Sequence, residues 1–140
     1  MIRAVCDTNI VVSAFFWGGL PRQVLDAARA KHCQLIATEE LLAELTDVLS
    51  RPKFARALAQ LGETPYSIIE FGYRSLVEVV EAKKINPVVI DDPDDDQLIA
   101  CAVGGNAHYI VSGDHHLLSI GTYQNIKLIT IRDFLEIIVI

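Results

Sequence analysis

Two patterns of apolar and polar residues alternate along the chain. Short apolar runs, about as long as a buried strand, are separated by longer stretches in which apolar residues recur every three or four positions. The first pattern predicts strands and the second predicts amphipathic helices. The predicted strands are 2–6, 33–37, 87–90, 108–112 and 127–129, and the predicted helices are 20–31, 39–49, 53–61, 66–82, 93–103, 114–118 and a last one after Thr130. This alternation is typical of an α/β fold with a parallel sheet.

Several predicted boundaries carry residues that begin or end helices. Thr38 and Asp92 are suited to N-cap positions, and Asp92 is followed by Pro93 in the first turn. Gly104 and the glycine after it indicate a helix end. Thr130 resembles the first residue of a capping box, which predicts that the final helix begins directly after it.

Length and composition limit the class of protein. A chain of 140 residues with 51% hydrophobic residues predicts a single domain over 1–140 with a real core. No apolar stretch is long enough for a membrane span, and the N-terminus does not read as a signal peptide, so we expect a cytoplasmic protein. The three cysteines, Cys6, Cys33 and Cys101, lie in apolar contexts and are expected to be buried, reduced thiols.

The net charge of −6 argues against binding nucleic acid over a broad surface. Any affinity for nucleic acid must then come from a local basic patch or from a bound metal. Arg51, Lys53 and Arg56 lie close together at one helix junction and are candidates for such a patch, although solvated surface is the simpler interpretation. The run Phe15–Phe16–Trp17 before a glycine pair is either a base-stacking platform, an interface with another protein or part of the core.

Two acidic residues directly follow predicted strands. Asp7 ends the run IRAVC, and Asp114 follows YIVSG. Ligands of open parallel sheets bind beyond the carboxyl ends of the strands, where both residues are expected to lie. Charge beside a core is costly unless it is compensated, and hard divalent cations take oxygen ligands. The alternative is that each Asp is only a turn or N-cap residue.

Two further acids come from predicted helices. On a helical wheel Glu44 lies beside Val48, at the border of the apolar stripe of its helix. In the acidic run of the helix that starts near residue 93, Asp96 shares a face with Ile99, whereas Asp95 projects partly toward Leu98, so geometry alone leaves both open. Residues that could orient these carboxylates are Thr8, Asn9, Ser13 and Ser112, and His116 is a candidate at the rim.

Four motifs together resemble the PIN domain. They are DTNIVVSAF, ELLAELTDVLSRPKF, DPDDDQLIACAV and YIVSGDHHLL, and the resemblance extends from Ile2 to about Leu118. The chain looks most similar to the VapC-type ribonucleases, the toxin components of toxin–antitoxin systems. The interval between Asp96 and Asp114 fits the register of that family and favours Asp96 over Asp95.

The resemblance implies a three-layer sandwich whose central parallel sheet has about five strands. It implies that Asp7, Glu44, Asp96 and Asp114 surround Mg²⁺ or Mn²⁺ and catalyse hydrolysis of RNA. It also implies a small antitoxin protein as partner and a homodimer or higher homo-oligomer. One departure is His116, which stands where this branch often has a second Asp.

Two other functions remain as alternatives. The chain could be a PIN-like binding or oligomerisation module whose site has decayed and which acts through a protein partner. A phosphotransfer or aspartyl-phosphate phosphatase domain is disfavoured, because the phosphatase requires an Asp two positions after Asp7 and the chain has Asn9 there.

Overall fold

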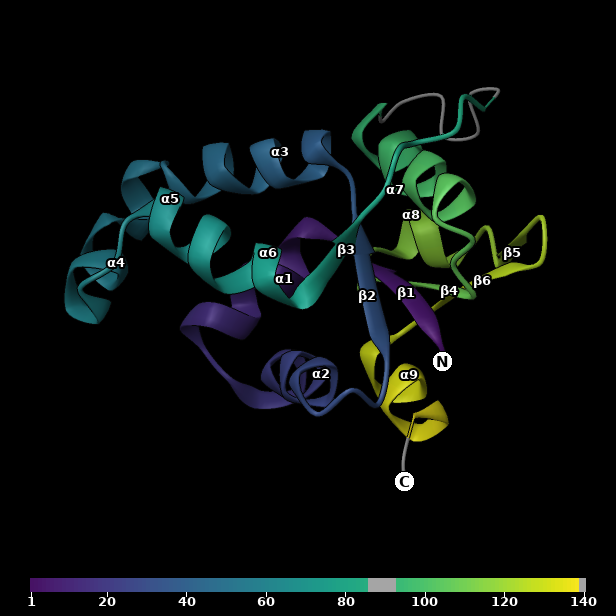
Figure 1. The fold of residues 1–140 in the computed structure, drawn as a ribbon, viewed down its shortest axis with the longest axis horizontal. Coiled ribbons are helices and arrows are strands. Elements are labelled where there is room, and N and C mark those ends of the chain that lie inside the picture. Colours follow the sequence, from purple (N-terminus) through teal and green to yellow (C-terminus); the bar gives the residue numbers. More distant parts are fainter. Residues whose placement is uncertain (86–92, 139–140) are drawn as a thin grey trace.

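A six-stranded sheet forms the centre of the computed structural model, which describes residues 1–85 and 93–138 (Figure 1). The strand order is β3-β2-β1-β4-β6-β5. All neighbouring pairs are parallel except the edge pair of β5 and β6. The strands are β1 (Arg3–Cys6), β2 (Gln34–Ala37), β3 (Val77–Val79), β4 (Tyr109–Val111), β5 (Thr122–Tyr123) and β6 (Ile126–Ile129).

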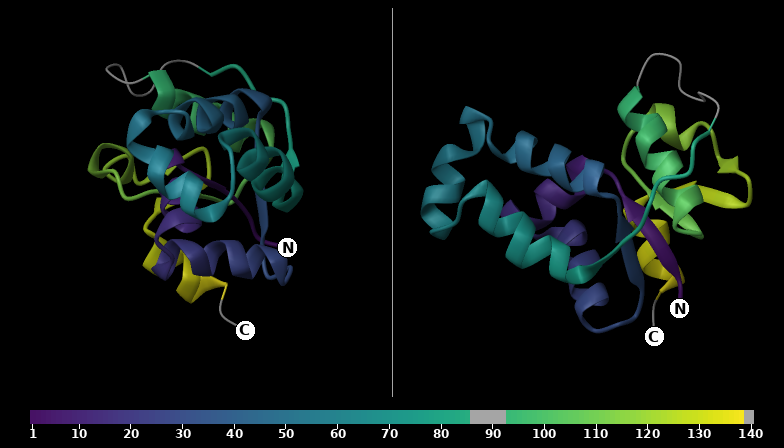
Figure 2. Two further views of the ribbon diagram at one scale, coloured as in Figure 1. Left: turned by 90° about the vertical axis from the view of Figure 1, so that its left-hand side faces the viewer. Right: turned by 45° about the horizontal axis from the view of Figure 1, so that its top comes forward.

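Helices cover both faces of the sheet, and a helical arm extends beyond it (Figures 1 and 2). The arm consists of α3, α4 and the helical segment that runs from α5 to α6. The helices are α1 (Thr8–Phe16), α2 (Gly19–Arg29), α3 (Glu39–Leu49), the 3₁₀ turn η1 (Pro52–Phe54), α4 (Ala55–Leu61), α5 (Pro65–Ser67), the π-helical η2 (Ile68–Tyr73), α6 (Arg74–Leu76), α7 (Pro93–Gly104), α8 (His115–Leu118) and α9 (Ile131–Ile137).

Side chains that alternate along the strands divide the core into two clusters. Ala4 and Cys6 of β1 pack into one cluster with α1, α2 and α9, whereas Val5 packs into the other with α7 and α8. Neighbouring Ile110 and Val111 of β4 divide between the clusters in the same way. Because successive side chains of a strand point to opposite faces, the apolar strand runs supply both cores at once. The predicted class, an α/β fold with a mostly parallel sheet between helical layers, is confirmed.

Two strand predictions need correction. The helix predicted over 66–82 ends at Leu76, because Val77 to Val79 leave the helix and pair in parallel with β2. The sheet has six strands rather than about five, since β3 and the short antiparallel β5 were not predicted. The predicted strand 87–90 and the N-cap Asp92 lie outside the described residues.

The predicted caps agree with the structure where they can be compared. Thr38 accepts a hydrogen bond from the backbone N–H of Leu41 at the start of α3, and Thr130 accepts one from Asp133 at the start of α9. Helix α7 ends at Gly104, where an added Cβ would lie 2.0 Å from the carbonyl oxygen of Glu81. Only glycine therefore lets the chain after β3 pack against this helix end.

The three cysteines are buried and unbonded, as predicted. Burial raises the pKa of Cys33 to about 11 and that of Cys101 to about 12, and it also raises the pKa of Cys6. These thiols are therefore unreactive core residues. Within residues 1–85 and 93–138, no helix has the length and apolar character needed to cross a membrane.

Candidate active site

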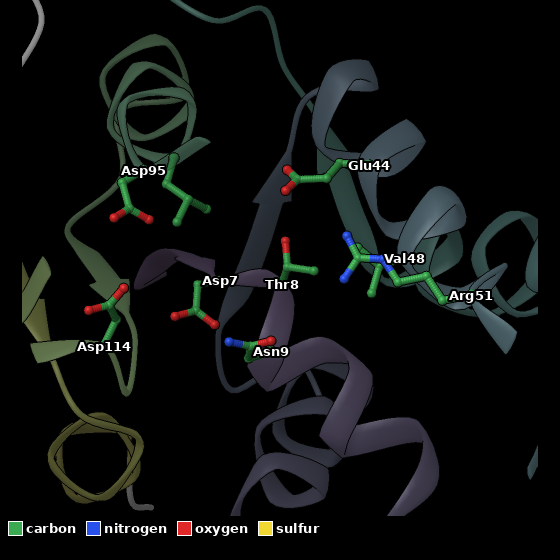
Figure 3. A pocket seen from close by; sticks show the side chains of 9 residues that line it. Asp7, Thr8, Asn9, Glu44, Val48, Arg51, Asp95 and Asp114 are labelled. Carbon is green, nitrogen blue, oxygen red and sulfur yellow. The ribbon is translucent and has the colours of Figure 1, made fainter. Parts of the chain in front are cut away.

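An acidic pocket of about 200 Å³ opens at the carboxyl edge of the sheet (Figure 3). Segments that are far apart in the sequence contribute to it: the β1–α1 junction, α3, the first turn of α7 and the junction after β4. The lining residues are Asp7, Thr8, Asn9, Glu44, Val48, Arg51, Asp95, Leu98 and Asp114. Four carboxylates and one guanidinium thus share a single small pocket.

Asp7 is the most deeply placed of the acids that follow a strand, with 7% of its surface exposed. It is the N-cap of α1, and its Oδ1 accepts a hydrogen bond from the backbone N–H of Ile10 at 3.1 Å. Its Oδ2 accepts a hydrogen bond from Ser112 Oγ at 2.5 Å. Burial raises the pKa of Asp7, the two hydrogen bonds oppose that rise, and the nearby charge of Asp114 adds to it.

Ser112 joins the two strand ends that carry these acids. β1 and β4 are parallel neighbours, and Cys6 pairs with Val111 one residue before the site begins. The fully buried Ser112 donates to Asp7, and its Oγ accepts the backbone N–H of Asp114 at 3.0 Å. Asp114 is in turn the N-cap of α8. The hydrogen bond from Ser112 to Asp7 therefore supports the expectation that Ser112 orients a carboxylate.

Glu44 and Asp95 complete the acidic lining from opposite helices. Glu44 is half-buried on α3, at the border of the apolar face as the wheel predicts. Asp95 lies in the first turn of α7 with 8% of its surface exposed, and its Oδ2 is shielded from solvent. Figure 3 shows the side chains of Glu44, Asp95, Asp7 and Asp114 surrounding one space.

The pocket takes in Asp95 rather than Asp96, the acid that the family register favours. Asp95 lines the pocket, and Asp96 is not among the lining residues. Ile99 is fully buried between the two faces, but Ala102, seven residues after Asp95, is fully buried, whereas Val103, seven residues after Asp96, is only partly buried. The buried stripe therefore carries Asp95 inward and turns Asp96 aside.

The remaining expected residues divide into two groups. Thr8 and Asn9 line the pocket at the start of α1, as expected. Ser13 is one turn further along α1 and does not line it. His116 is exposed; its backbone N–H donates to Asp114 Oδ1 at 2.8 Å, and its side chain is not part of the lining.

Arg51 is the lining residue that sequence reasoning placed elsewhere, as part of a surface patch. It directly follows α3 and points into the pocket on the side of Glu44 (Figure 3). A helical signal was present, because Val48 and Arg51 come four and seven residues after Glu44 and therefore share its face. Because the helix is predicted to end before Pro52, the sequence pattern places Arg51 in a surface patch instead of on this face.

The donor set fits a hard divalent cation in kind. All four acids offer carboxylate oxygens, and the charges of Asp7 and Asp114 disfavour each other unless a cation lies between them. Within the described residues, no three His, Cys, Asp or Glu side chains are already arranged to hold a metal ion. Mg²⁺ usually keeps several waters and binds through one or two carboxylates, so such an arrangement is not required.

Comparison with known proteins identifies the family. The PIN domain model matches residues 3–116, and the chain therefore belongs to the PIN domain family. Among solved structures, it is similar to a chain of VapBC2 from Rickettsia felis bound to a DNA fragment from their promoter. The TM-score is 0.59 and the sequence identity 19%, with 92% of this chain and 98% of that chain covered, which shows a shared fold. A search of curated proteins finds no significant match.

Proposed function

We propose that the protein is a divalent-metal-dependent ribonuclease that hydrolyses RNA phosphodiester bonds and acts as the toxin of a toxin–antitoxin pair. The convergence of Asp7, Glu44, Asp95 and Asp114 in one pocket carries the proposal. Membership of the PIN domain family supports the nuclease activity. No nucleophilic side chain is needed, since water is the attacking group.

Each residue of the pocket has a defined part in this proposal. Asp7 and Asp95, the most buried acids, are the principal ligands of Mg²⁺ or Mn²⁺, and Glu44 and Asp114 complete the ligand set or orient water. When bound, the cation makes water more acidic and neutralises charge on the phosphate. Ser112 fixes the orientation of Asp7, and the guanidinium of Arg51 binds a phosphate oxygen of the substrate.

Cleavage of a mixed RNA pool by the purified protein tests the activity. We expect cleavage with Mn²⁺ or Mg²⁺ and none with EDTA. Asp95→Asn should abolish cleavage, and its neighbour Asp96→Asn is the matched control. Glu44→Gln should likewise lower the rate, with the exposed Glu40→Gln on the same helix as control. Full metal-dependent cleavage by both Asp7→Asn and Asp95→Asn would refute the proposal.

A small antitoxin protein is the proposed partner. The structural relative VapBC2 is a complex, which supports this assignment by analogy of fold. A second hollow of about 440 Å³ between α2 and the helical arm offers an apolar surface for it, lined in part by Phe15, Leu25, Leu61, Ile68 and Phe71. Co-expression with the protein encoded by a small adjacent reading frame should yield a complex with suppressed cleavage, and failure of every such frame to bind would contradict the toxin role.

The competing proposal is a decayed PIN-like module that acts only through a protein partner. The observation behind it is that, in the described part of the chain, no three possible ligands are already arranged around a metal position. Calorimetric titration with Mn²⁺ separates the two. Binding that is lost in Asp7→Asn favours the enzyme, whereas no binding to the wild-type protein favours the decayed module.

A further inference from the structure

A cluster of aromatic rings lies beside basic residues near the acidic pocket. We call Phe16, Trp17, Lys53 and Phe54 the aromatic–basic platform. The Phe16 and Phe54 rings stack at 5.4 Å between centroids, and Trp17 packs edge-on against Phe54 at 6.3 Å. Phe54 is buried, whereas Trp17 is 68% exposed. The stacked rings of Phe16 and Phe54 thus support an indole whose surface faces water.

The backbone holds Trp17 in this position. Trp17 is the C-cap of α1, and its N–H donates to the carbonyl oxygen of Ser13 at 2.9 Å. Gly18 and Gly19 follow with φ of 73° and 67°, a left-handed conformation that favours glycine. The chain therefore turns sharply away after Trp17. This local geometry leaves the indole at the surface although apolar contacts are available beneath it.

The platform is directly connected to the acidic pocket. Phe54 ends the 3₁₀ turn η1, and its N–H donates to the carbonyl oxygen of Arg51 at 3.0 Å. Arg51 lines the pocket, so a single turn of backbone separates the pocket from the aromatic rings. A molecule that contacts Arg51 in the pocket therefore lies within one turn of backbone of Phe54, the central ring of the platform.

Positive charge gathers along the same path. Arg51, Lys53 and Arg56 are all exposed, and the Lys53 ammonium lies 5.1 Å from the centre of the Phe54 ring. The protein as a whole carries a charge of −6, so this cluster stands out against an acidic background. Exposed rings beside cations are the combination with which proteins bind single-stranded nucleic acid, since bases stack and phosphates pair with the cations.

We propose that the aromatic–basic platform binds single-stranded RNA, with one base stacked on Trp17 and the backbone phosphates contacting Lys53, Arg56 and Arg51. This inference rests on the proposed ribonuclease function and adds a binding site outside the acidic pocket, which takes unpaired bases because a base held in a duplex cannot stack on a side chain. The platform then selects unpaired RNA and leads its phosphate chain into the acidic pocket.

Binding measured without cleavage tests this inference separately from the nuclease activity. The full-length Asp7→Asn variant is titrated, in EDTA, with a labelled single-stranded RNA of mixed sequence and with the same RNA in a duplex. Trp17 is the only tryptophan, so stacking should quench the intrinsic fluorescence of the protein. We expect quenching by the single strand and far weaker binding of the duplex.

Two matched pairs of variants locate the contact. Adding Trp17→Ala should weaken binding of the labelled RNA by about 10-fold or more, whereas Tyr66→Ala, which removes another exposed ring, should not. Lys53→Ala should lower the slope of log affinity against log salt by about 0.7, the value for one phosphate contact on a single strand. Lys84→Ala removes the same charge from another exposed position and should leave the slope unchanged.

Several outcomes would overturn the inference. Equal RNA affinity of the Trp17→Ala and Tyr66→Ala variants would contradict the stacking contact. A change from dimer to monomer in Trp17→Ala, measured by sedimentation, would assign the platform to a second copy of the chain instead. Unquenched fluorescence with intact metal-dependent cleavage would refute the platform alone, whereas quenching without any cleavage by the wild-type protein would refute the nuclease proposal alone.

Discussion

Asp7 carries its carboxyl group at a position where water has little access. Burial is the main reason that its pKa is raised, so the folded protein binds a proton there more tightly than the unfolded chain does. The native state therefore becomes less stable, relative to the unfolded state, as pH rises from the unfolded pKa through the raised native pKa. Above that native pKa the whole cost of the ionised carboxylate is present in the metal-free protein.

Asp7→Asn is expected to raise the Tm of the metal-free protein by a few degrees at pH 7. The amide has a similar shape and retains an oxygen for the Ile10 N–H, but carries no charge. The gain should shrink as pH falls through the raised native pKa and should vanish below the unfolded pKa of about 3.9, where Asp7 is protonated in both states. Thermal melts in EDTA across this pH range provide the measurement, and a variant less stable than the wild type at pH 7 would show that the contacts of the carboxylate outweigh its burial.

Arg51 differs from the acids because the proposed function assigns it to the substrate rather than to the metal. Arg51→Ala should lower kcat/KM by about 10-fold or more, the loss of one charged hydrogen bond, while Mn²⁺ affinity stays the same. Arg51→Lys should recover part of the loss, since it retains the charge but not the planar fork. Arg29→Ala, at an exposed guanidinium paired with Asp26, is the control. Loss of metal binding in Arg51→Ala would mean that Arg51 organises the pocket instead.

At the scale of elements, β1, β2, β4, β6 and most helices could be predicted because local pattern and tertiary packing agree. Residues 77–79 are an exception, as is the short β5: Val-Glu-Val continues an apolar pattern that suits a helix, but pairing with the edge of β2 makes it a strand. The acids of α7 show the same limit. The buried stripe includes both Leu98 and Ile99, so the pattern leaves both acids open, and only the packing of α7 shows that Asp95 lines the pocket.

Ser112 joins β1 and β4 at their carboxyl ends, so its removal affects both elements. Ser112→Ala removes a hydrogen bond that lowers the pKa of Asp7, and that pKa should therefore rise further. Because the proposed metal ligand is the ionised form of Asp7, the acidic limb of the pH–rate profile should move to higher pH. The free energy of unfolding should fall by about 1.5 to 3 kcal/mol, as for a hydrogen bond to a charged group.

Ser119→Ala is a suitable control for that experiment, since this exposed hydroxyl donates only to the carbonyl oxygen of His116. It should leave both the pH–rate profile and the stability near those of the wild type. An unchanged acidic limb in Ser112→Ala would indicate that Asp7 does not set the pH dependence of the reaction.

Across the whole molecule, the pocket unites positions from Asp7 to Asp114. The sequence allowed three of the four carboxylates to be named, because each follows a strand or borders a helical stripe. It could not show that Arg51 shares their pocket, since that depends on how α3 crosses the end of the sheet. A ligand in this pocket contacts four segments that lie far apart in the sequence, and it should therefore stabilise the whole fold rather than one element.

Mn²⁺ is accordingly expected to raise the Tm of the wild-type protein. At a free concentration 100 times the Kd, binding to the native state alone adds about 2.7 kcal/mol, which corresponds to roughly 10 °C for a domain of this size. Hydrogen exchange should slow together in β1, α3 and the start of α7, because their residues share the ligand. KCl at matched ionic strength controls for screening, and Asp95→Asn should show no rise. An equal increase of Tm in KCl, or in Asp95→Asn, would mean that the carboxylates do not bind the cation as a set.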